Sequence, residues 1–206
     1  MKRIILIGNG GHSKVIKDII DESPDYTVVG FLDNKFSSYE ENGNCFYDNL
    51  DNIKFYSEDY YFCLAIGNNV IRNKLFKEMQ LHKNRFPALI HSTASVSPSA
   101  QIGFGTVVMP NAVINADARI GNHVIVNSGS VIEHDNFIED YVHISPNATL
   151  AGNVAIGVRS HIAIGASVLP QIKIGSDCII GAGATVINNV NDKQIVVGTP
   201  AKPKEE

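Results

Sequence analysis

An aliphatic residue recurs at every sixth position over nearly half of the 206-residue chain. From Val96 to Val186, each of sixteen consecutive sixth positions is Val, Ile or Leu. The residue two places earlier is usually small, as at Ala112 and Ala148. A period of six fits neither an α-helix, whose period is 3.6, nor a flat strand, whose period is two. It predicts a solenoid in which each six-residue unit forms one short strand and one turn.

The same segment also repeats at a longer interval. Ile-Gly pairs begin at positions 102, 120, 156 and 174, which are separated by multiples of eighteen residues, or three units. We therefore expect triangular coils, about five in number, with aliphatic side chains inside and small residues at the corners. Strands of successive coils should lie ~4.8 Å apart. The fold expected for residues 91–206 is a parallel β-helix of the hexapeptide type.

Residues 1–90 follow a different pattern and carry 23 of the 38 Lys, Arg, Asp and Glu residues. Residues 4–7 predict a buried strand, residues 8–11 a glycine turn, and residues 15–20 the apolar stripe of a helix. A second strand, 26–33, ends at Asp33. This succession opens a Rossmann-like α/β unit. Ser13 stands where the third glycine of GxGxxG would be, so the dinucleotide signature is partial.

A second unit follows, with a strand at 61–66, a turn at 67–69 and a helix after it. The polar stretch 34–60 between the two units predicts a surface loop with little regular structure. A region of ninety residues is short for a full dinucleotide domain, so a mononucleotide or nucleotide-linked sugar fits it better than NAD. Plain strand–helix packing without a ligand is the alternative for such a turn.

Composition excludes several classes of protein. A net charge of −4 argues against a nucleic-acid or anionic-membrane partner. No apolar run reaches the length of a transmembrane helix, and the short run after Arg3 is better interpreted as a strand than as a signal peptide. Cys45, Cys63 and Cys178 have no metal-binding or CxxC spacing. We therefore expect reduced thiols, a cytoplasmic location and no metal.

Two histidines of the repeat, His134 and His143, should both face outward. They are half a coil apart, so they should point from different parts of the triangle, and a trimer could bring His134 of one chain near His143 of the next. Gly152 lies one coil above His134, which should leave a channel beside the imidazole for a pantetheine arm. His161 lies one coil above His143, so these two rings should stack.

For the remaining histidines we expect mainly structural or surface positions. We expect His82 and His123 to be solvated surface residues, and His91 to have a structural role at the junction of the two halves. His12 follows the glycine turn and could contact a phosphate or cap the helix. Cys178 occupies a small-residue corner position and should be buried and inert.

Six sequence segments, together with the hexapeptide run, resemble the NeuD/PglD family of bacterial sugar acetyltransferases over nearly the whole chain. These segments are IGNGGHSKVI (7–16), GFLD (30–33), AIGNNVIR (65–72), LIHSTASVSP (89–98), VIEHD (131–135) and VVGTPAK (196–202). The resemblance implies a Rossmann-like nucleotide-sugar-binding domain at 1–90. It implies a left-handed β-helix acyltransferase domain with a C-terminal tail at 91–206, assembled as a homotrimer with acetyl-CoA between adjacent β-helices.

The resemblance also implies roles for particular residues. His134 would be the general base, Asp135 would replace the family's glutamate in orienting it, and Asn127 matches a further active-site position. The implied acetyl-CoA contacts are His143, Gly152, Ala163, Ile164, Ala182, Gly183 and Lys202. The implied substrate contacts are Gly8, Asn9, Gly10, Gly11, His12, Asp33, Asn68 and Arg72.

The activity implied is acetyl-CoA-dependent N-acetylation of a nucleotide-linked 4-amino-4,6-dideoxy sugar for surface glycans. UDP is the expected nucleotide, with GDP and dTDP as alternatives. O-acetylation of sialic acid, free or activated with CMP, is the second enzymatic interpretation from the same family. Two further alternatives remain. One is a non-enzymatic trimeric scaffold whose site is vestigial, and the other is an enzyme that uses NAD in the N-terminal turn.

Overall fold

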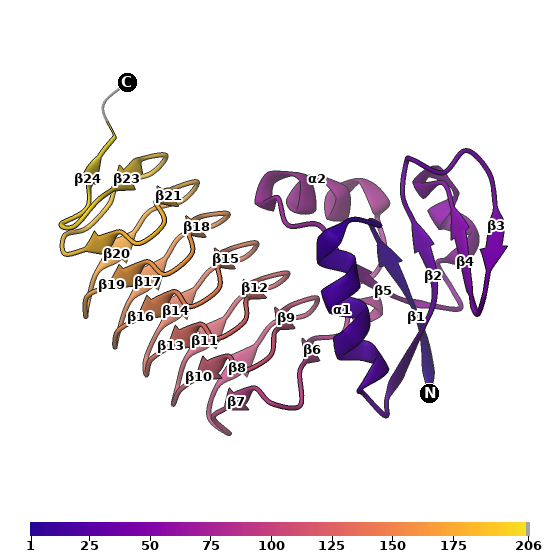
Figure 1. The fold of residues 1–206 in the computed structure, drawn as a ribbon, viewed down its shortest axis with the longest axis horizontal. Coiled ribbons are helices and arrows are strands. Elements are labelled where there is room, and N and C mark those ends of the chain that lie inside the picture. The colour runs from indigo at the N-terminus through magenta and orange to yellow at the C-terminus, as the bar shows by residue number, and fades with distance from the viewer. Residues whose placement is uncertain (205–206) are drawn as a thin grey trace.

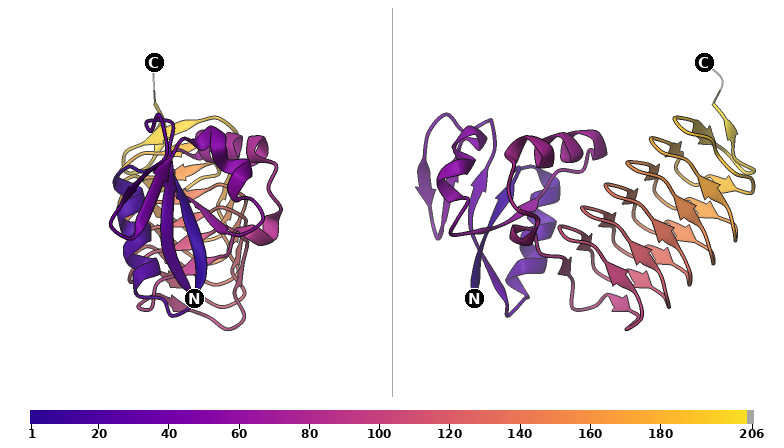
Figure 2. Two further views of the ribbon diagram at one scale, coloured as in Figure 1. Left: turned by 90° about the vertical axis from the view of Figure 1, so that its right-hand side faces the viewer. Right: turned by 180° about the vertical axis from the view of Figure 1, so that it is seen from behind.

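The computed structural model describes residues 1–204. An α/β half lies at one end of a stack of triangular coils, and the last strands of the chain form the far end of that stack (Figure 1). Figure 2 shows the same stack from behind and end-on, with the α/β half covering its first coils. The predicted fold class, a Rossmann-like α/β domain followed by a hexapeptide β-helix, is confirmed. No helix of the described residues is both long and apolar enough to cross a membrane.

The α/β half is built on a five-stranded sheet of order β3-β4-β2-β1-β5. All pairings in it are parallel except that of β3 with β4. The strands are β1 (Lys2–Ile7), β2 (Tyr26–Leu32), β3 (Glu40–Asn42), β4 (Cys45–Asp48) and β5 (Tyr61–Leu64). The helix α1 (Gly11–Asp21) joins β1 to β2, α2 (Asn69–Met79) follows β5, and two short 3-10 helices are η1 (Leu50–Tyr56) and η2 (Lys83–Arg85).

The expectation of an irregular loop at 34–60 is wrong, because this stretch supplies β3, β4 and η1. Its polar residues hide an aromatic cluster in which Phe46 stacks on Tyr56 with ring centroids 4.9 Å apart. The Phe46 ring also lies over Gly30 of β2, where an added Cβ would sit 2.4 Å from the ring. Aromatic packing therefore holds a fourth parallel strand, β4, on the sheet.

The β-helix has three faces, which we number in chain order. Face 1 contains β6 (Leu89–Ile90), β9 (Val107–Val108), β12 (Ile125–Val126), β15 (His143–Ile144), β18 (His161–Ile162), β21 (Ile179–Ile180), β23 (Ile195–Val197) and β24 (Lys202–Pro203). Face 2 contains β7 (Ser95–Val96), β10 (Val113–Ile114), β13 (Val131–Ile132), β16 (Thr149–Leu150), β19 (Ser167–Val168) and β22 (Thr185–Val186). Face 3 contains β8 (Gln101–Ile102), β11 (Arg119–Ile120), β14 (Phe137–Ile138), β17 (Ala155–Ile156) and β20 (Lys173–Ile174).

The sixfold repeat determines the core of these coils. Each two-residue strand ends in the repeated aliphatic residue, and Ile132, Ile144 and Ile162 are fully buried. The small residues two places earlier are also buried, and Cys178 is one of them, as predicted. From Gly105 to Gly183, each corner contains a residue with positive φ, which is a glycine or a residue such as Asn111. The corners define edge 1–2, edge 2–3 and edge 3–1, each named for the faces that it joins.

One core connects the two halves of the molecule. Apolar residues of β1 and α1, including Ile4 and Ile16, pack in the same cluster as Leu89, Val107 and Ile125 of face 1. The strand β6 already pairs with β9, although it precedes residue 91. Leu89 and Ile90 thus belong to face 1 by their pairing. The division of the chain into domains at residue 90 stays a prediction.

A buried arginine of α2 ties the α/β half to edge 3–1. Arg72 is 1 % exposed. Its Nε donates to the carbonyl of His123 at 2.9 Å, and Nη2 donates to the carbonyl of Tyr141 at 2.8 Å. The remaining donors bind Oδ1 of Asn69 and the carbonyls of residues 66 and 67. The five N–H groups of the guanidinium thereby have partners within the chain, which gives Arg72 a structural role, while its substrate contact stays a prediction.

His123 is not solvated as expected. It is fully buried at edge 3–1, where it stacks on Tyr141 and contacts three phenylalanines. Burial and the nearby Arg72 lower its pKa to about 3, so it packs as a neutral aromatic ring. His91 has the structural role expected, because its Nε2 lies 3.1 Å from Oε2 of Glu22 after α1.

Replacing Arg72 by Met should destabilise the protein, because several buried carbonyls would lose their charged donor. Each buried unpaired polar group costs about 1–3 kcal/mol, so we expect a loss of about 3 kcal/mol or more. Urea unfolding followed by circular dichroism measures this loss. The matched control is Arg119→Met on exposed face 3, which should change stability little. An equal effect of the two substitutions would contradict the assigned role.

Candidate active site

The strand order reverses direction at β1, whose neighbours are β2 on one side and β5 on the other. The turns after β1 and β5 start α1 and α2 at this switch point, where open α/β sheets bind ligands. Gly8 has φ +101° there, and a Cβ on it would lie 2.6 Å from Cδ1 of Ile66. Cβ atoms on Gly10 and Gly11 would meet nothing within 4 Å. The first turn is therefore tightly packed at Gly8 and open at Gly10 and Gly11, and this open part leaves room for a phosphate to approach the backbone.

Asp33 at the end of β2 holds the first turn in shape. Its Oδ2 accepts a hydrogen bond from the backbone N–H of Asn9 at 2.7 Å. Lys35 donates to the carbonyl of Asn9, also at 2.7 Å. Asn68 has a similar task in the second turn, where its Oδ1 accepts from the N–H of Ile71 and caps α2. Both side chains thus make hydrogen bonds that shape the turns, and their contacts with a ligand stay predictions.

His12 lies in the first turn of α1 and does not cap the helix, since Gly10 is the N-cap residue. Its Nε2 is buried without a hydrogen-bond partner among the described residues. Burial and then the charge of Arg72 lower the pKa of His12 to about 4. His12 is close enough to His143 to affect its pKa. The α/β half therefore presents a neutral imidazole toward face 1 of the β-helix.

His143 stands on face 1, in β15, and stacks on His161 of β18 as predicted. The ring centroids are 4.9 Å apart and the planes differ by 12°. Nε2 of His143 lies 3.0 Å from Nδ2 of Asn127, and Nε2 of His161 lies 2.7 Å from Oγ of Ser145. Burial, followed by the charge of His161, lowers the pKa of His143 to about 3. The sequence did not reveal Ser145, because only coil stacking brings it beside His161.

Most of the predicted acetyl-CoA contacts form one row along edge 1–2. Asn127 follows β12 at one end of the row, Ala163 and Ile164 follow β18, and Ala182 follows β21 with Gly183 beside it. Ile164 is 60 % exposed. Lys202 lies in β24, at the far end of face 1 (Figure 1). A straight, exposed row of this kind suits an extended ligand, while the contacts themselves stay predictions.

His134 and Asp135 lie on a different edge, edge 2–3. Nδ1 of His134 is 2.8 Å from Oδ2 of Asp135, and both side chains are about three-fifths exposed, at 61% and 59%. Asp135 has φ +57°, a conformation that aspartate tolerates better than most residues. The hydrogen bond with Asp135 raises the pKa of His134, with smaller contributions from the charges of Asp135 and Glu133, and burial opposes the rise. The shorter carboxylate therefore reaches the imidazole.

Gly152 lies one coil above His134, as predicted, but it does not leave an empty channel. A Cβ on Gly152 would lie 2.7 Å from both Cε1 and Nε2 of His134. The imidazole itself covers Gly152 and occupies the expected space. Any side chain larger than that of glycine at residue 152 would collide with the His134 ring where it now lies.

A single chain does not bring all the predicted residues together. His134, Asp135 and Gly152 lie on edge 2–3, whereas Asn127 and His143 lie at edge 1–2 and on face 1. The glycine turns of the α/β half meet face 1 and edge 3–1, because Asn69 donates to the carbonyl of Arg159 at 2.9 Å. The expected base is therefore remote from the expected substrate crevice within one chain.

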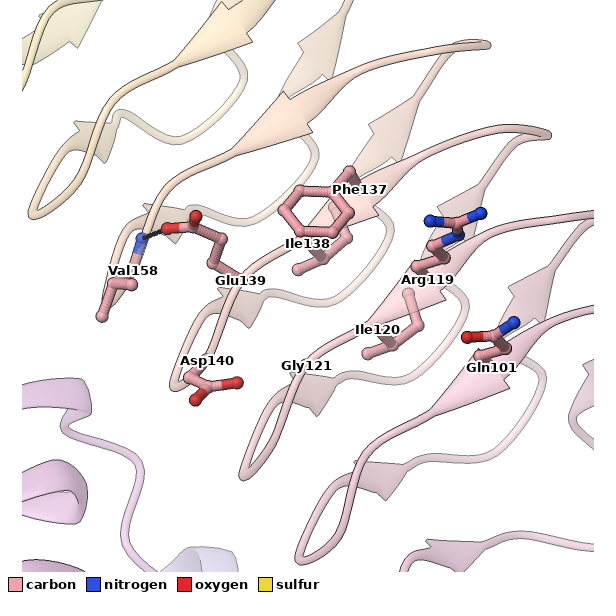
Figure 3. A pocket seen from close by; sticks show the side chains of 9 residues that line it. All are labelled: Gln101, Arg119, Ile120, Gly121, Phe137, Ile138, Glu139, Asp140 and Val158. Carbon is pink, nitrogen blue, oxygen red and sulfur yellow. Dashed lines mark hydrogen bonds between the residues drawn. The ribbon is translucent and has the colours of Figure 1, made fainter.

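Two pockets lie away from most of these residues. One of about 400 Å³ on face 3 is lined by Gln101, Arg119 and Phe137 among others (Figure 3). Its Glu139 already accepts the N–H of Val158 at 2.9 Å. The second, about 360 Å³, lies between the start of α2 and His161. Within residues 1–204 there is no cluster of three or more His, Cys, Asp or Glu suited to a metal ion.

Family comparisons agree with this division of the chain. Residues 3–79 match the PglD N-terminal domain, and residues 99–134 match the bacterial transferase hexapeptide family of six repeats. UDP-N-acetylbacillosamine N-acetyltransferase of Bacillus subtilis (strain 168) is 45% identical over 113 residues, which are 53% of this chain and 52% of that protein. The matched segment thus spans about half the length of this curated relative.

Solved structures match over the whole chain. A histidine mutant of perosamine N-acetyltransferase from Caulobacter crescentus, in complex with CoA and GDP-perosamine, superposes with a TM-score of 0.89. It is 32% identical, over 100% of this chain and 98% of that one. The acetyltransferase domain of PglB from Neisseria gonorrhoeae FA1090 has a TM-score of 0.90 and 35% identity over 99% and 100% of the two chains.

These likenesses cover both halves of the molecule and the connection between them, at identities above 30%. The same combination of an α/β half and a left-handed β-helix therefore occurs in these solved acetyltransferases. The chain belongs to the NeuD/PglD family of bacterial sugar acetyltransferases.

Proposed function

We propose that this protein transfers the acetyl group of acetyl-CoA to the 4-amino group of a nucleotide-linked 4-amino-4,6-dideoxy sugar. One observation carries the proposal: the crevice of the α/β half opens onto His143, where the row along edge 1–2 begins. Gly67, in the second turn of that crevice, is close enough to His143 to affect its pKa. A nucleotide sugar in the crevice and acetyl-CoA along the edge would therefore meet at His143 and Asn127.

The reaction proposed is a direct displacement. The neutral amine attacks the thioester carbon, a C–N bond forms, the C–S bond breaks, and the sulfur leaves with the bonding electrons. His134 accepts the proton that the nitrogen loses and can return it to the thiolate, which gives an amide and free CoA. Asp135 holds Nδ1 of His134, which leaves Nε2 free as the base and stabilises the imidazolium that forms.

The separation of the two edges supports a homotrimer with shared sites. His134 on edge 2–3 of one chain would lie beside His143 and Asn127 of its neighbour. This arrangement would supply a base to a crevice that has none positioned for the amine within its own chain.

The relatives suggest the nucleotide. The Bacillus relative is named for a UDP-linked sugar, and the Caulobacter enzyme was crystallised with GDP-perosamine. We propose UDP, with GDP as the second choice, and a cytoplasmic site of action because acetyl-CoA and nucleotide sugars are used there. Both relatives are N-acetyltransferases, which favours an amine acceptor over sialic acid.

Acetyl transfer is tested by following CoA thiol release with UDP-, GDP- and dTDP-linked 4-amino-6-deoxy sugars and with sialic acid. We expect turnover with one nucleotide-linked amino sugar and a loss of about 10²–10⁴-fold in kcat for His134→Ala. Arg119→Ala on face 3 serves as the control and should retain activity. Turnover with sialic acid alone would overturn the proposal.

Replacing Asp135 by Asn should shift the pH dependence of the reaction. The carboxylate raises the pKa of His134, so its removal lowers that pKa and the neutral base persists to lower pH. We expect the acidic limb of kcat/KM to move to lower pH while the plateau falls by about tenfold or more, since the imidazole loses its orientation. An unmoved acidic limb would show that His134 is not the titrating base.

A shared site predicts restoration of activity on subunit mixing. Light scattering should give a mass of three times the 22.4 kDa chain. His134→Ala and Asn127→Ala chains should each be nearly inactive, but their co-expressed mixture should regain activity because some sites would combine two intact edges. A site within one chain would give no restoration, because every site would then carry a lesion.

A further inference from the structure

The orientation of the Asn127 side-chain amide is fixed by its neighbours. Its Oδ1 accepts a hydrogen bond from the backbone N–H of Ser128 at 2.8 Å. Its Nδ2 consequently faces Nε2 of His143 at 3.0 Å. An amide nitrogen donates and does not accept, so Nε2 of His143 must be the acceptor in this pair. This nitrogen therefore carries no proton.

The proton of the neutral His143 ring then belongs to Nδ1. Gly67 of the α/β half lies close enough to the ring to oppose the lowering of its pKa, although less strongly than burial lowers it. Burial, then the charges of His161, Arg72 and His12, hold the pKa of His143 at about 3, so the ring is neutral at pH 7. The ring is therefore the neutral Nδ1–H tautomer, with Nε2 directed at Asn127.

This arrangement changes the expected role of His143. A residue that stabilises the thioester oxygen must donate a hydrogen bond, and Nε2 of His143 has none to give. Nδ2 of Asn127 carries two hydrogens, and only one has a partner among the described residues. Asn127 is also the residue that begins the row along edge 1–2. Its second N–H is the side-chain donor available there.

We infer that Nδ2 of Asn127 donates a hydrogen bond to the thioester carbonyl oxygen, and that His143 is a positioning residue which accepts the other hydrogen of the same amide. The inference rests on the proposed function. As the amine attacks, the carbonyl electron pair moves onto the oxygen and is stabilised by the amide. When the C–S bond breaks, the pair returns and the carbonyl re-forms. Asn127 neither gains nor loses a proton.

The ring of His161 supports this arrangement from the next coil. It lies parallel to His143 and is itself fixed by Oγ of Ser145. Stacking restricts the tilt of the His143 ring, and its Nε2 stays directed at Asn127. Three residues on two adjacent coils, His143, Ser145 and His161, thus orient a single N–H group.

Steady-state kinetics of four variants test the inference. Asn127→Ala and Asn127→Asp remove the donor, and we expect kcat to fall about 10²–10³-fold with little change in KM for acetyl-CoA. His143→Gln keeps an acceptor near Nε2 and should stay within about tenfold of the wild type. His143→Phe keeps the flat ring, loses the acceptor and should fall well below His143→Gln. Thermal midpoints establish that each variant is folded.

The inference is overturned if Asn127→Ala keeps a kcat close to that of the wild type. It is also overturned if His143→Gln is as impaired as His143→Phe, since an acceptor at this position would then be irrelevant.

Nitrogen-15 NMR of histidine-labelled full-length protein provides a readout independent of activity. We expect the His143 signals, assigned by their loss in His143→Gln, to show a protonated Nδ1 and an unprotonated Nε2 at pH 7. A proton on Nε2 overturns the inference even when the enzyme is active. If no nucleotide-linked amino sugar is acetylated, the proposed function fails, which is a different result from an active enzyme with the opposite tautomer.

Discussion

The position of the α/β half depends on the guanidinium of Arg72. The corners of edge 3–1 require a residue with positive φ, and two of them, His123 and Tyr141, direct backbone carbonyls at α2. Arg72 collects these carbonyls together with those of its own turn. A planar group with five fixed donors can bind this set, whereas a lysine could not. The contact places the glycine turns of the sheet against face 1.

The site follows from that placement. Because α2 is fixed on edge 3–1, the turn that contains Gly67 lies beside His143. His143 then reaches Asn127 at edge 1–2, and the crevice of the α/β half is joined to the exposed row that ends near Lys202. The proposed base, His134, lies on edge 2–3, away from the edge that Arg72 and Asn69 contact. In the proposed assembly of several chains, crevice, row and base would combine.

Much of the fold could be predicted from the sequence, because the repeat is strict. Each aliphatic residue from Ile114 to Val186 lies where a period of six places it, and the stack of His143 on His161 follows from a spacing of eighteen. The strand β4 could not be predicted in the same way. Its stretch of chain is dominated by polar residues, and only contact with Gly30 and β2 reveals Phe46 as core.

For the histidines, too, local contacts could be predicted from the sequence and contacts with other elements could not. His134 and Asp135 are adjacent in sequence, so their hydrogen bond could be anticipated from residue type and local geometry. His123 was predicted to be exposed, yet it is buried, because Phe76 of α2, Phe86 after η2 and Phe104 of the preceding coil cover it. The bond between Ser145 and His161 joins adjacent coils, and the approach of Gly67 to His143 joins the two halves of the molecule.

Sequence periodicity and residue type were enough to predict the β-helix and the glycine turns. These features depend on short-range spacing and on the conformations that each residue permits. The three-dimensional packing was needed to learn that Arg72 is structural, that the imidazole of His134 lies over Gly152, and which nitrogen of His143 is free of a proton. Those outcomes depend on which buried donors and acceptors meet across the interface of the two halves, and sequence spacing does not encode such distances.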